Sequence, residues 1–395
     1  MNVKALAVAL LLVVSAIGPA TAAATGVTQD ASATTGTYVE FQTDGDALTD
    51  YSVNGKTVVD SVAVQSKSEA QSSGGLGASV SLKAVTNFQA AGLSIASGFD
   101  SQASTSATVE SQSGATIEAH DNDRGVMVVT AAEESQYVMA NLSSDAEAEQ
   151  SSDKRVVVTK ESGESGAFLV VGEGKVTVNE EGNVSADLAQ DAKLVYRQYE
   201  GERSDGEKQQ EQLIADGTAT AEVYYQQAEE SGEDGQQRTA DVVRYSEDTT
   251  VEVTERSQNE VNMTVERAQS QGKVVIVSVS EAAMENAQNA KVFVDGEAAV
   301  KASSYSEVQS AANGGDDCKY LVQSSSSAQA STDVVVGINH FSAREMSVQS
   351  GDDSSSGGDG GDGSGDSPTE GSGPGFGVLA TLAAIGAALF ARTRL

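Results

Sequence analysis

Few residues of this sequence could carry out chemistry, and His120 and His340 are its only histidines. A metal site built from several histidines is therefore excluded. His120 precedes Asp121, Asn122 and Asp123, whose oxygens could ligate a cation, but a solvated turn is the simpler interpretation. His340 follows a Val-rich segment, where a hydrogen-bonded residue at the end of a strand is expected.

Nucleophilic catalysis has little support. A Ser–His–Asp site is conceivable among so many serines and aspartates, but no Gly-x-Ser-x-Gly motif frames a serine. Cys318 is the only cysteine, which excludes an intramolecular disulfide. Pairs of carboxylates arise by chance among 58 acidic residues, so they do not diagnose a glycosidase. The chain has no Trp, which counts against a carbohydrate-binding surface. We predict no catalytic residues, no cofactor and a non-enzymatic protein.

One acidic group and three sequons are candidate ligand or modification sites. Asp44, Gly45 and Asp46 with Asp50 could hold calcium, but calcium loops have more regular ligand spacing and a bidentate Glu, so the metal question stays open. The Asn-x-Ser/Thr motifs predict N-glycosylation. Asn183 falls in a predicted turn, which makes it the most accessible acceptor. The three acceptors are Asn141, Asn183 and Asn262.

The elements that must position these residues are mostly short strands. Two-residue turns at Asn54-Gly55 and Asp295-Gly296, and the turn at 180–183, each separate β-prone runs, as in hairpins. Val80, Leu82 and Ala84 alternate with polar residues and predict a further strand. We expect a mostly β fold with one or two β-sandwich-like domains; a β-solenoid is the alternative.

Changes in composition divide the chain. Residues 25–200 and 208–349 are predicted to be two β-rich domains, separated by a charged segment without apolar residues at 201–206. A short helix is expected near 208–215. Ser304 and Glu307 form a possible capping box for a second helix.

The two ends are predicted to be sorting segments. Residues 1–24 have a basic start, an apolar stretch and Ala-rich cleavage triplets, as in a secretory signal peptide. At the other end, residues 350–374 form a Gly/Ser/Asp spacer that should stay extended. Residues 375–395 then form a predicted transmembrane helix that ends at Arg392 and Arg394, which favour the inner membrane surface.

Pro374, Gly375 and Phe376, followed by the apolar helix and the terminal arginines, resemble the PGF-type C-terminal sorting signal of archaeal surface proteins. The resemblance covers only about the last 25 residues. It implies that an archaeosortase removes the helix and attaches a lipid near the motif. An uncut single-pass anchor is the alternative.

The formal net charge of −34, together with abundant small residues, resembles haloarchaeal proteins, because molar salt screens such self-repulsion. Nucleic acid is excluded as a partner at this charge. We therefore predict a lipid-anchored glycoprotein at the cell surface, in the membrane or S-layer, with a structural or adhesive role and with S-layer or other envelope proteins as partners. A tethered binding module for cations or an envelope protein, and an extracellular hydrolase, are the alternatives.

Overall fold

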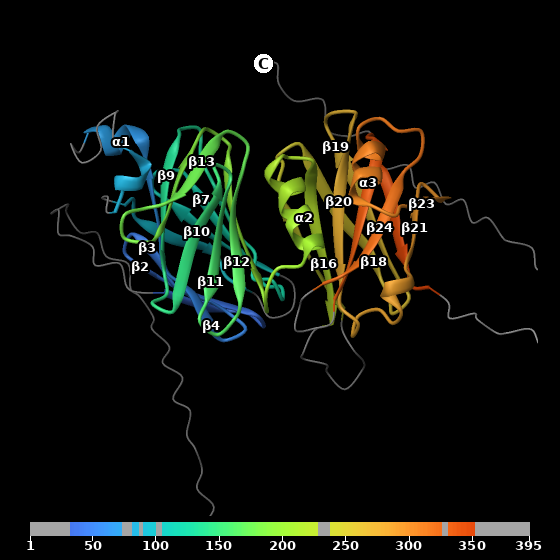
Figure 1. Ribbon diagram of the computed structural model, residues 1–395, viewed down its shortest axis with the longest axis horizontal. Helices are drawn as coiled ribbons and strands as arrows, with labels where there is room; N and C mark the ends of the chain where they lie inside the picture. Colours follow the sequence, from blue (N-terminus) through green and yellow to red (C-terminus); the bar gives the residue numbers. More distant parts are fainter. Residues whose placement is uncertain are drawn as a thin grey trace, which may run out of the picture. The chain divides into compact units, whose positions relative to one another are not determined.

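The computed structural model describes residues 32–72, 81–86, 90–99, 105–227, 238–325 and 331–351, and most of these lie in four β-sheets (Figure 1). The prediction of a mostly β fold is confirmed. Among these residues no sheet closes into a barrel and no regular solenoid is present, so the solenoid alternative is wrong for this part of the chain. The segments 1–24 and 375–395, and the spacer beyond residue 351, lie outside the described residues.

The first part of the chain forms two antiparallel sheets. Sheet A has the order β1-β2-β3-β4-β9-β14-β13, and sheet B the order β10-β11-β12-β15-β8-β7-β6-β5. The strands of sheet A are β1 (Ser32–Thr35), β2 (Val39–Asp44), β3 (Ala47–Val53), β4 (Lys56–Ser66), β9 (Gln136–Leu142), β13 (Gly174–Val178) and β14 (Val184–Leu188). Those of sheet B are β5 (Leu93–Ser97), β6 (Ser106–Ser111), β7 (Thr116–His120), β8 (Met127–Thr130), β10 (Ala146–Ser152), β11 (Arg155–Lys160), β12 (Ser165–Val171) and β15 (Lys193–Tyr199).

The second part forms two further sheets. Sheet C has the order β17-β16-β20-β25-β24-β23, with parallel pairs β16–β20 and β23–β24, and sheet D the order β18-β19-β26-β21-β22. The strands of sheet C are β16 (Ala219–Gln227), β17 (Arg238–Arg244), β20 (Gln271–Val279), β23 (Val300–Lys301), β24 (Lys319–Ser324) and β25 (Thr332–His340). Those of sheet D are β18 (Thr249–Arg256), β19 (Glu260–Arg267), β21 (Lys291–Val294), β22 (Glu297–Ala298) and β26 (Arg344–Gln349).

Three large apolar cores hold the sheets, and a small fourth cluster contains Ala70 and Val85. One is formed by residues of sheets A and B, and another by residues of sheets C and D. The third joins sheet B to α2 (Asp205–Ala215), α3 (Tyr305–Ala312) and sheet C. Strand β20 shows the consequence: alternate residues of its Val-rich run belong to the second and third cores, so both of its faces are buried as its sequence predicts. All described residues belong to one compact unit, and the division into two domains stays a prediction.

The predicted two-residue turns are present, and their central residues have the positive φ that such turns require. Asn54 and Gly55 have φ of 52° and 71° between β3 and β4, and Asp295 and Gly296 have 51° and 79° between β21 and β22. The turn at 180–183 joins β13 to β14.

Two local predictions are wrong. Residues Leu82–Ala84 form a 3₁₀ turn instead of part of a strand. The predicted helix near 208–215 is present as α2, but the complete capping box lies at its start, between Ser204 and Glu207. At α3, the Ser304 side chain makes no capping bond, and Glu307 accepts instead from Ser303 Oγ at 2.7 Å. The remaining helices are α1 (Lys67–Ser72) and a 3₁₀ turn at Ala287–Asn289, and none of the described helices is long and apolar enough to cross a membrane.

Candidate functional site

The turn between β7 and β8 carries the densest group of chemistry-capable side chains. Asn122 Oδ1 accepts from the Arg124 backbone N–H at 3.2 Å, which fixes the turn locally. The side chains then enter the region between sheets B and C, where His120 is 3 % exposed and Asn122 is fully buried. The prediction of a solvated turn is therefore wrong, because distant residues of sheet C cover the turn.

Asp241 on β17 is the main partner of this turn. Its carboxylate lies 3.0 Å from His120 Nδ1 and accepts from Asn122 Nδ2 at 2.7 Å and from Thr105 Oγ1 at 3.0 Å. Burial lowers the pKa of His120, but the charge and hydrogen bond of Asp241 raise this pKa, and the net shift is upward. His120 Nε2 is buried and has no hydrogen-bond partner among the described residues.

Arg124 extends the network toward α2 and β25. Its guanidinium donates to Asp333 at 2.8 Å and to Glu207 at 3.3 Å, and it lies 5.1 Å from the centre of the Tyr199 ring. Glu207 is also the capping-box residue of α2, so one carboxylate serves both the helix start and the ion pair. Burial lowers the pKa of Arg124, but the nearby Asp333 charge raises it, and the net shift of the pKa is upward, so the arginine stays charged.

Arg197 on β15 forms a second buried ion pair. Arg197 and Glu222 are both fully buried, at an N–O distance of 2.7 Å. Glu222 also accepts from the Tyr245 hydroxyl at 2.5 Å, and Gln210 of α2 accepts from Arg197 at 3.3 Å. Arg197 Nε and Nη1 are buried without a partner among the described residues, which makes this pair costly to desolvate. These contacts hold sheets B and C together, with the Arg197 and Glu222 charges paired inside the protein.

The other predicted chemistry-capable residues lie apart from this network. His340 is the exposed last residue of β25, with Nε2 3.4 Å from Arg344 Nη1. Asp44, Gly45 and Asp46 belong to the exposed β2–β3 hairpin turn. No group of three or more His, Cys, Asp or Glu side chains suited to a metal ion occurs within the described ranges.

The three sequon asparagines differ in how their amides are held. Asn141 Nδ2 donates to Ser61 Oγ at 2.9 Å, and Asn262 Nδ2 donates to Glu255 at 3.1 Å. Asn183 lies in the turn before β14, and its Oδ1 accepts from the Leu142 N–H at 3.0 Å. No described residue accepts from its Nδ2, so Asn183 has the most available acceptor amide of the three.

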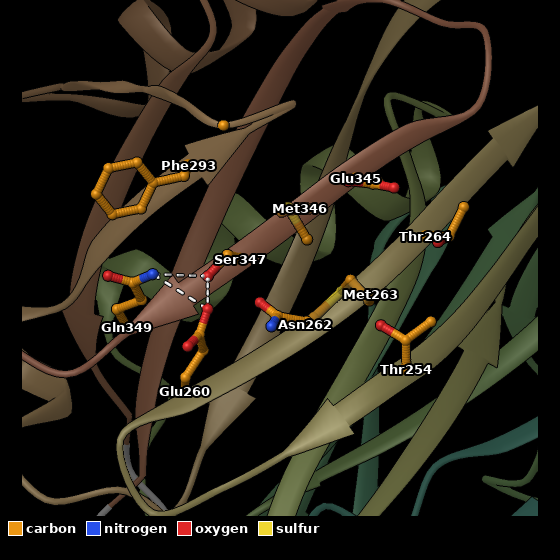
Figure 2. Close-up of a pocket in the computed structure, with 11 residues that line it drawn as sticks. Thr254, Glu260, Asn262, Met263, Thr264, Phe293, Glu345, Met346, Ser347 and Gln349 are labelled. Carbon is orange, nitrogen blue, oxygen red and sulfur yellow. Dashed lines mark hydrogen bonds between the residues drawn. The ribbon is translucent and has the colours of Figure 1, made fainter. Parts of the chain in front are cut away.

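The outer face of sheet D contains a pocket of about 540 Å³ (Figure 2). Its lining comes from β18, β19, β21 and β26 and includes Glu260, Asn262, Phe293, Ser347 and Gln349. Of these residues, only Asn262 belongs to a motif that can be recognised in the sequence, the sequon Asn262-Met263-Thr264. One signal was present: Phe293 stands between two valines that face the core, so alternation places its ring on the opposite face.

Comparisons with known proteins add little. No family model matches the chain, and no curated protein matches it. A solved structure of a glycoside hydrolase family 81 protein from Clostridium thermocellum is similar at 11 % identity and a TM-score of 0.33. The match covers 80 % of this chain but spans only 34 % of that protein. A likeness this low carries no argument about fold or function.

Proposed function

We propose that this protein is an exported, non-enzymatic surface glycoprotein of a haloarchaeon, anchored first by its C-terminal segment and then by a lipid, with a structural or adhesive role in the envelope. The observation that carries the proposal is the use of its buried titratable groups. Arg124, Arg197 and His120 are all paired with carboxylates between sheets B and C, which favours a rigid scaffold over a reaction centre.

Further support comes from the architecture and the sorting segments. We assign two sandwich-like domains to 25–200 and 208–349, and the separate cores of sheets A and B and of sheets C and D support this assignment. Pro374, Gly375 and Phe376 would direct cleavage of the tail by an archaeosortase. S-layer or other envelope proteins would be the neighbours of the anchored protein. Asn183 is the favoured glycan acceptor.

Intact and peptide mass spectrometry of protein extracted from its native membrane tests this proposal. We expect a chain that starts near Ala23 or Thr25, lacks residues 377–395, carries a lipid and has extra mass on Asn183. A Phe376→Ala variant should keep its tail, whereas the matched spacer variant Pro368→Ala should be processed normally. Wild-type protein that is intact to Leu395 would refute processing and leave an ordinary single-pass anchor.

A second candidate function is a tethered binding module, for which the pocket on sheet D is the specific support because several side chains converge on it. Neither histidine supports the hydrolase alternative. His120 is buried against Asp241, and His340 is exposed beside Arg344.

A further inference from the structure

We propose that the pocket on the outer face of sheet D binds a neutral saccharide, with one face of a sugar ring on Phe293 and sugar hydroxyls donating to Asn262 Oδ1 and Glu260. This inference rests on the binding-module candidate and is independent of lipid anchoring. It depends on the strand register, on the hydrogen-bonding state of the lining and on its charge.

The register places the lining in rows across the sheet. Phe293 pairs with Ser347, Ser347 with Asn262, and Asn262 with Glu255, so these four side chains form one row over β21, β26, β19 and β18. Adjacent strands are about 4.8 Å apart, which puts the Phe293 and Asn262 backbones roughly 10 Å apart. The small side chain of Ser347 lies between them. A small residue flanked by larger ones leaves a hollow, and the pocket lies there (Figure 2).

The polar groups around the hollow are held in place but have unused acceptors. Glu260 Oε1 accepts from Ser347 Oγ at 2.7 Å and from Gln349 Nε2 at 3.1 Å, and the Ser347 bond is the largest cause of its lowered pKa. Asn262 is oriented by its donation to Glu255, while its Oδ1 is buried without a partner among the described residues. A buried, unpaired carbonyl oxygen is unfavourable, and a ligand hydroxyl would satisfy it.

The charge of the lining favours a neutral ligand. No Lys or Arg lines the pocket, so an anion has no counter-charge there. Two carboxylates, Glu260 and Glu345, line the pocket. The Glu260 charge is already stabilised by two donors, Glu345 is exposed to solvent, and Lys291 occupies the same row as Gln349 and Glu260, which together weaken the case for an organic cation. A partly exposed aromatic ring beside amides and hydroxyls is suited to a sugar, which has apolar CH faces and many donors. Phe293 supplies the aromatic ring at this pocket, so the lack of Trp does not exclude a carbohydrate-binding surface here.

Two sources share this chemistry: a soluble oligosaccharide, and a glycan carried by an envelope glycoprotein. The sequon adds a constraint, because a glycan attached to Asn262 itself would fill the hollow. Protein that binds saccharide should therefore carry no glycan at Asn262.

The test is saturation-transfer NMR of the full exported chain in molar KCl with neutral methyl glycosides, and with glycopeptides released from the native envelope. We expect binding that weakens about fivefold in Phe293→Ala and in Asn262→Ala, since an aromatic contact and a hydrogen bond are each worth about 1 kcal/mol. Methyl glycosides that bind indicate a soluble source; binding by glycopeptides alone indicates an envelope glycan. Either result supports the proposal.

Matched controls separate the pocket from general effects. Tyr137→Ala removes a partly exposed aromatic from β9, and Asn141→Ala removes another in-strand sequon, and both should bind like wild type. Circular dichroism checks that every variant is folded. The proposal is overturned if no neutral sugar binds wild type, if folded Phe293→Ala and Asn262→Ala bind as well as wild type, or if the cation agmatine binds in place of sugars. Mass spectrometry of the tail is unaffected by any of these results.

Discussion

Polar side chains differ in burial and hydrogen bonding between two regions of the molecule: the contact region of sheets B and C, and the outer face of sheet D. Between the sheets, Arg197 and Glu222 are fully buried and bonded to each other, so their charges serve the fold. On sheet D, Glu260 and Asn262 are held by neighbours on the same face, yet keep oxygens directed to solvent or to a hollow. The comparison shows that hydrogen bonding alone does not identify a binding site; an unused acceptor on a residue that lines a hollow does.

The two regions should also respond differently to salt. Exposed charges are screened within about 3 Å in molar salt, whereas a buried pair is screened much less. Because of the excess of acidic residues, the contribution of the surface to the free energy of unfolding should depend on salt. The contribution of the buried ion pairs should change little with salt.

The largest expected effect comes from breaking the buried pair. Arg197→Met leaves Glu222 buried without its counter-charge and should lower the free energy of unfolding by about 3–5 kcal/mol. The double variant Arg197→Met/Glu222→Met removes both charges and should lose clearly less than the single variant. Urea unfolding measured at two KCl concentrations checks both expectations, and the loss should be nearly the same at each.

Arg256→Met is the matched control because Arg256 is exposed on β18. Its loss should stay below about 1 kcal/mol. A double variant that loses as much stability as Arg197→Met alone, or more, would contradict the argument that the unpaired Glu222 charge causes the loss.

A smaller effect is expected from pH. The pKa of His120 in the folded protein is raised above its unfolded value of about 6.5, so protonated His120 stabilises the fold. This contribution is complete below pH of about 6.5 and is lost as pH rises through the folded pKa. The free energy of unfolding should fall over that window in wild type, by about 1.4 kcal/mol for each unit of upward shift, and less in His120→Gln.

The exposed His340 provides the comparison for this measurement. His340→Gln removes the other histidine and leaves the buried network intact, so it is the matched control for loss of an imidazole. Equal slopes in wild type and His120→Gln would remove His120 as the cause.

The smallest effect concerns the two-residue turn between β3 and β4. Gly55 has φ of 71° and no atom near an added Cβ, so Gly55→Ala adds only backbone strain and should cost about 1 kcal/mol. Gly201 also has open space but no positive φ, and Gly201→Ala should change the stability little. Thermal unfolding of the two variants measures the difference, and equal midpoints would contradict the strain argument.

Local chemistry made part of this fold predictable. Asn54-Gly55 and Asp295-Gly296 specify their turns within two residues, and alternating Val runs specify strands. The buried network was not predictable in the same way. His120 and Asp241 are 121 residues apart in sequence, and only the packing of sheet B against sheet C brings them together.

The pocket was unpredictable for a related reason. Phe293, Ser347 and Asn262 come from three strands, and their common row depends on the register of two pairings. The alternation around Phe293 could have indicated an outward ring, but no local pattern shows that Ser347 lies beside it.

The position of β26 in sheet D has a mechanical consequence. This last strand is hydrogen-bonded on both sides, to β19 and to β21, and the chain leaves it through the buried Gly351. If the tail fixes the protein to the membrane, a pull on the anchor acts on a strand within the sheet and not on a sheet edge. That strand must break two ladders before it can leave, so the tether is attached to an interior strand of sheet D, which resists force better than an edge strand would.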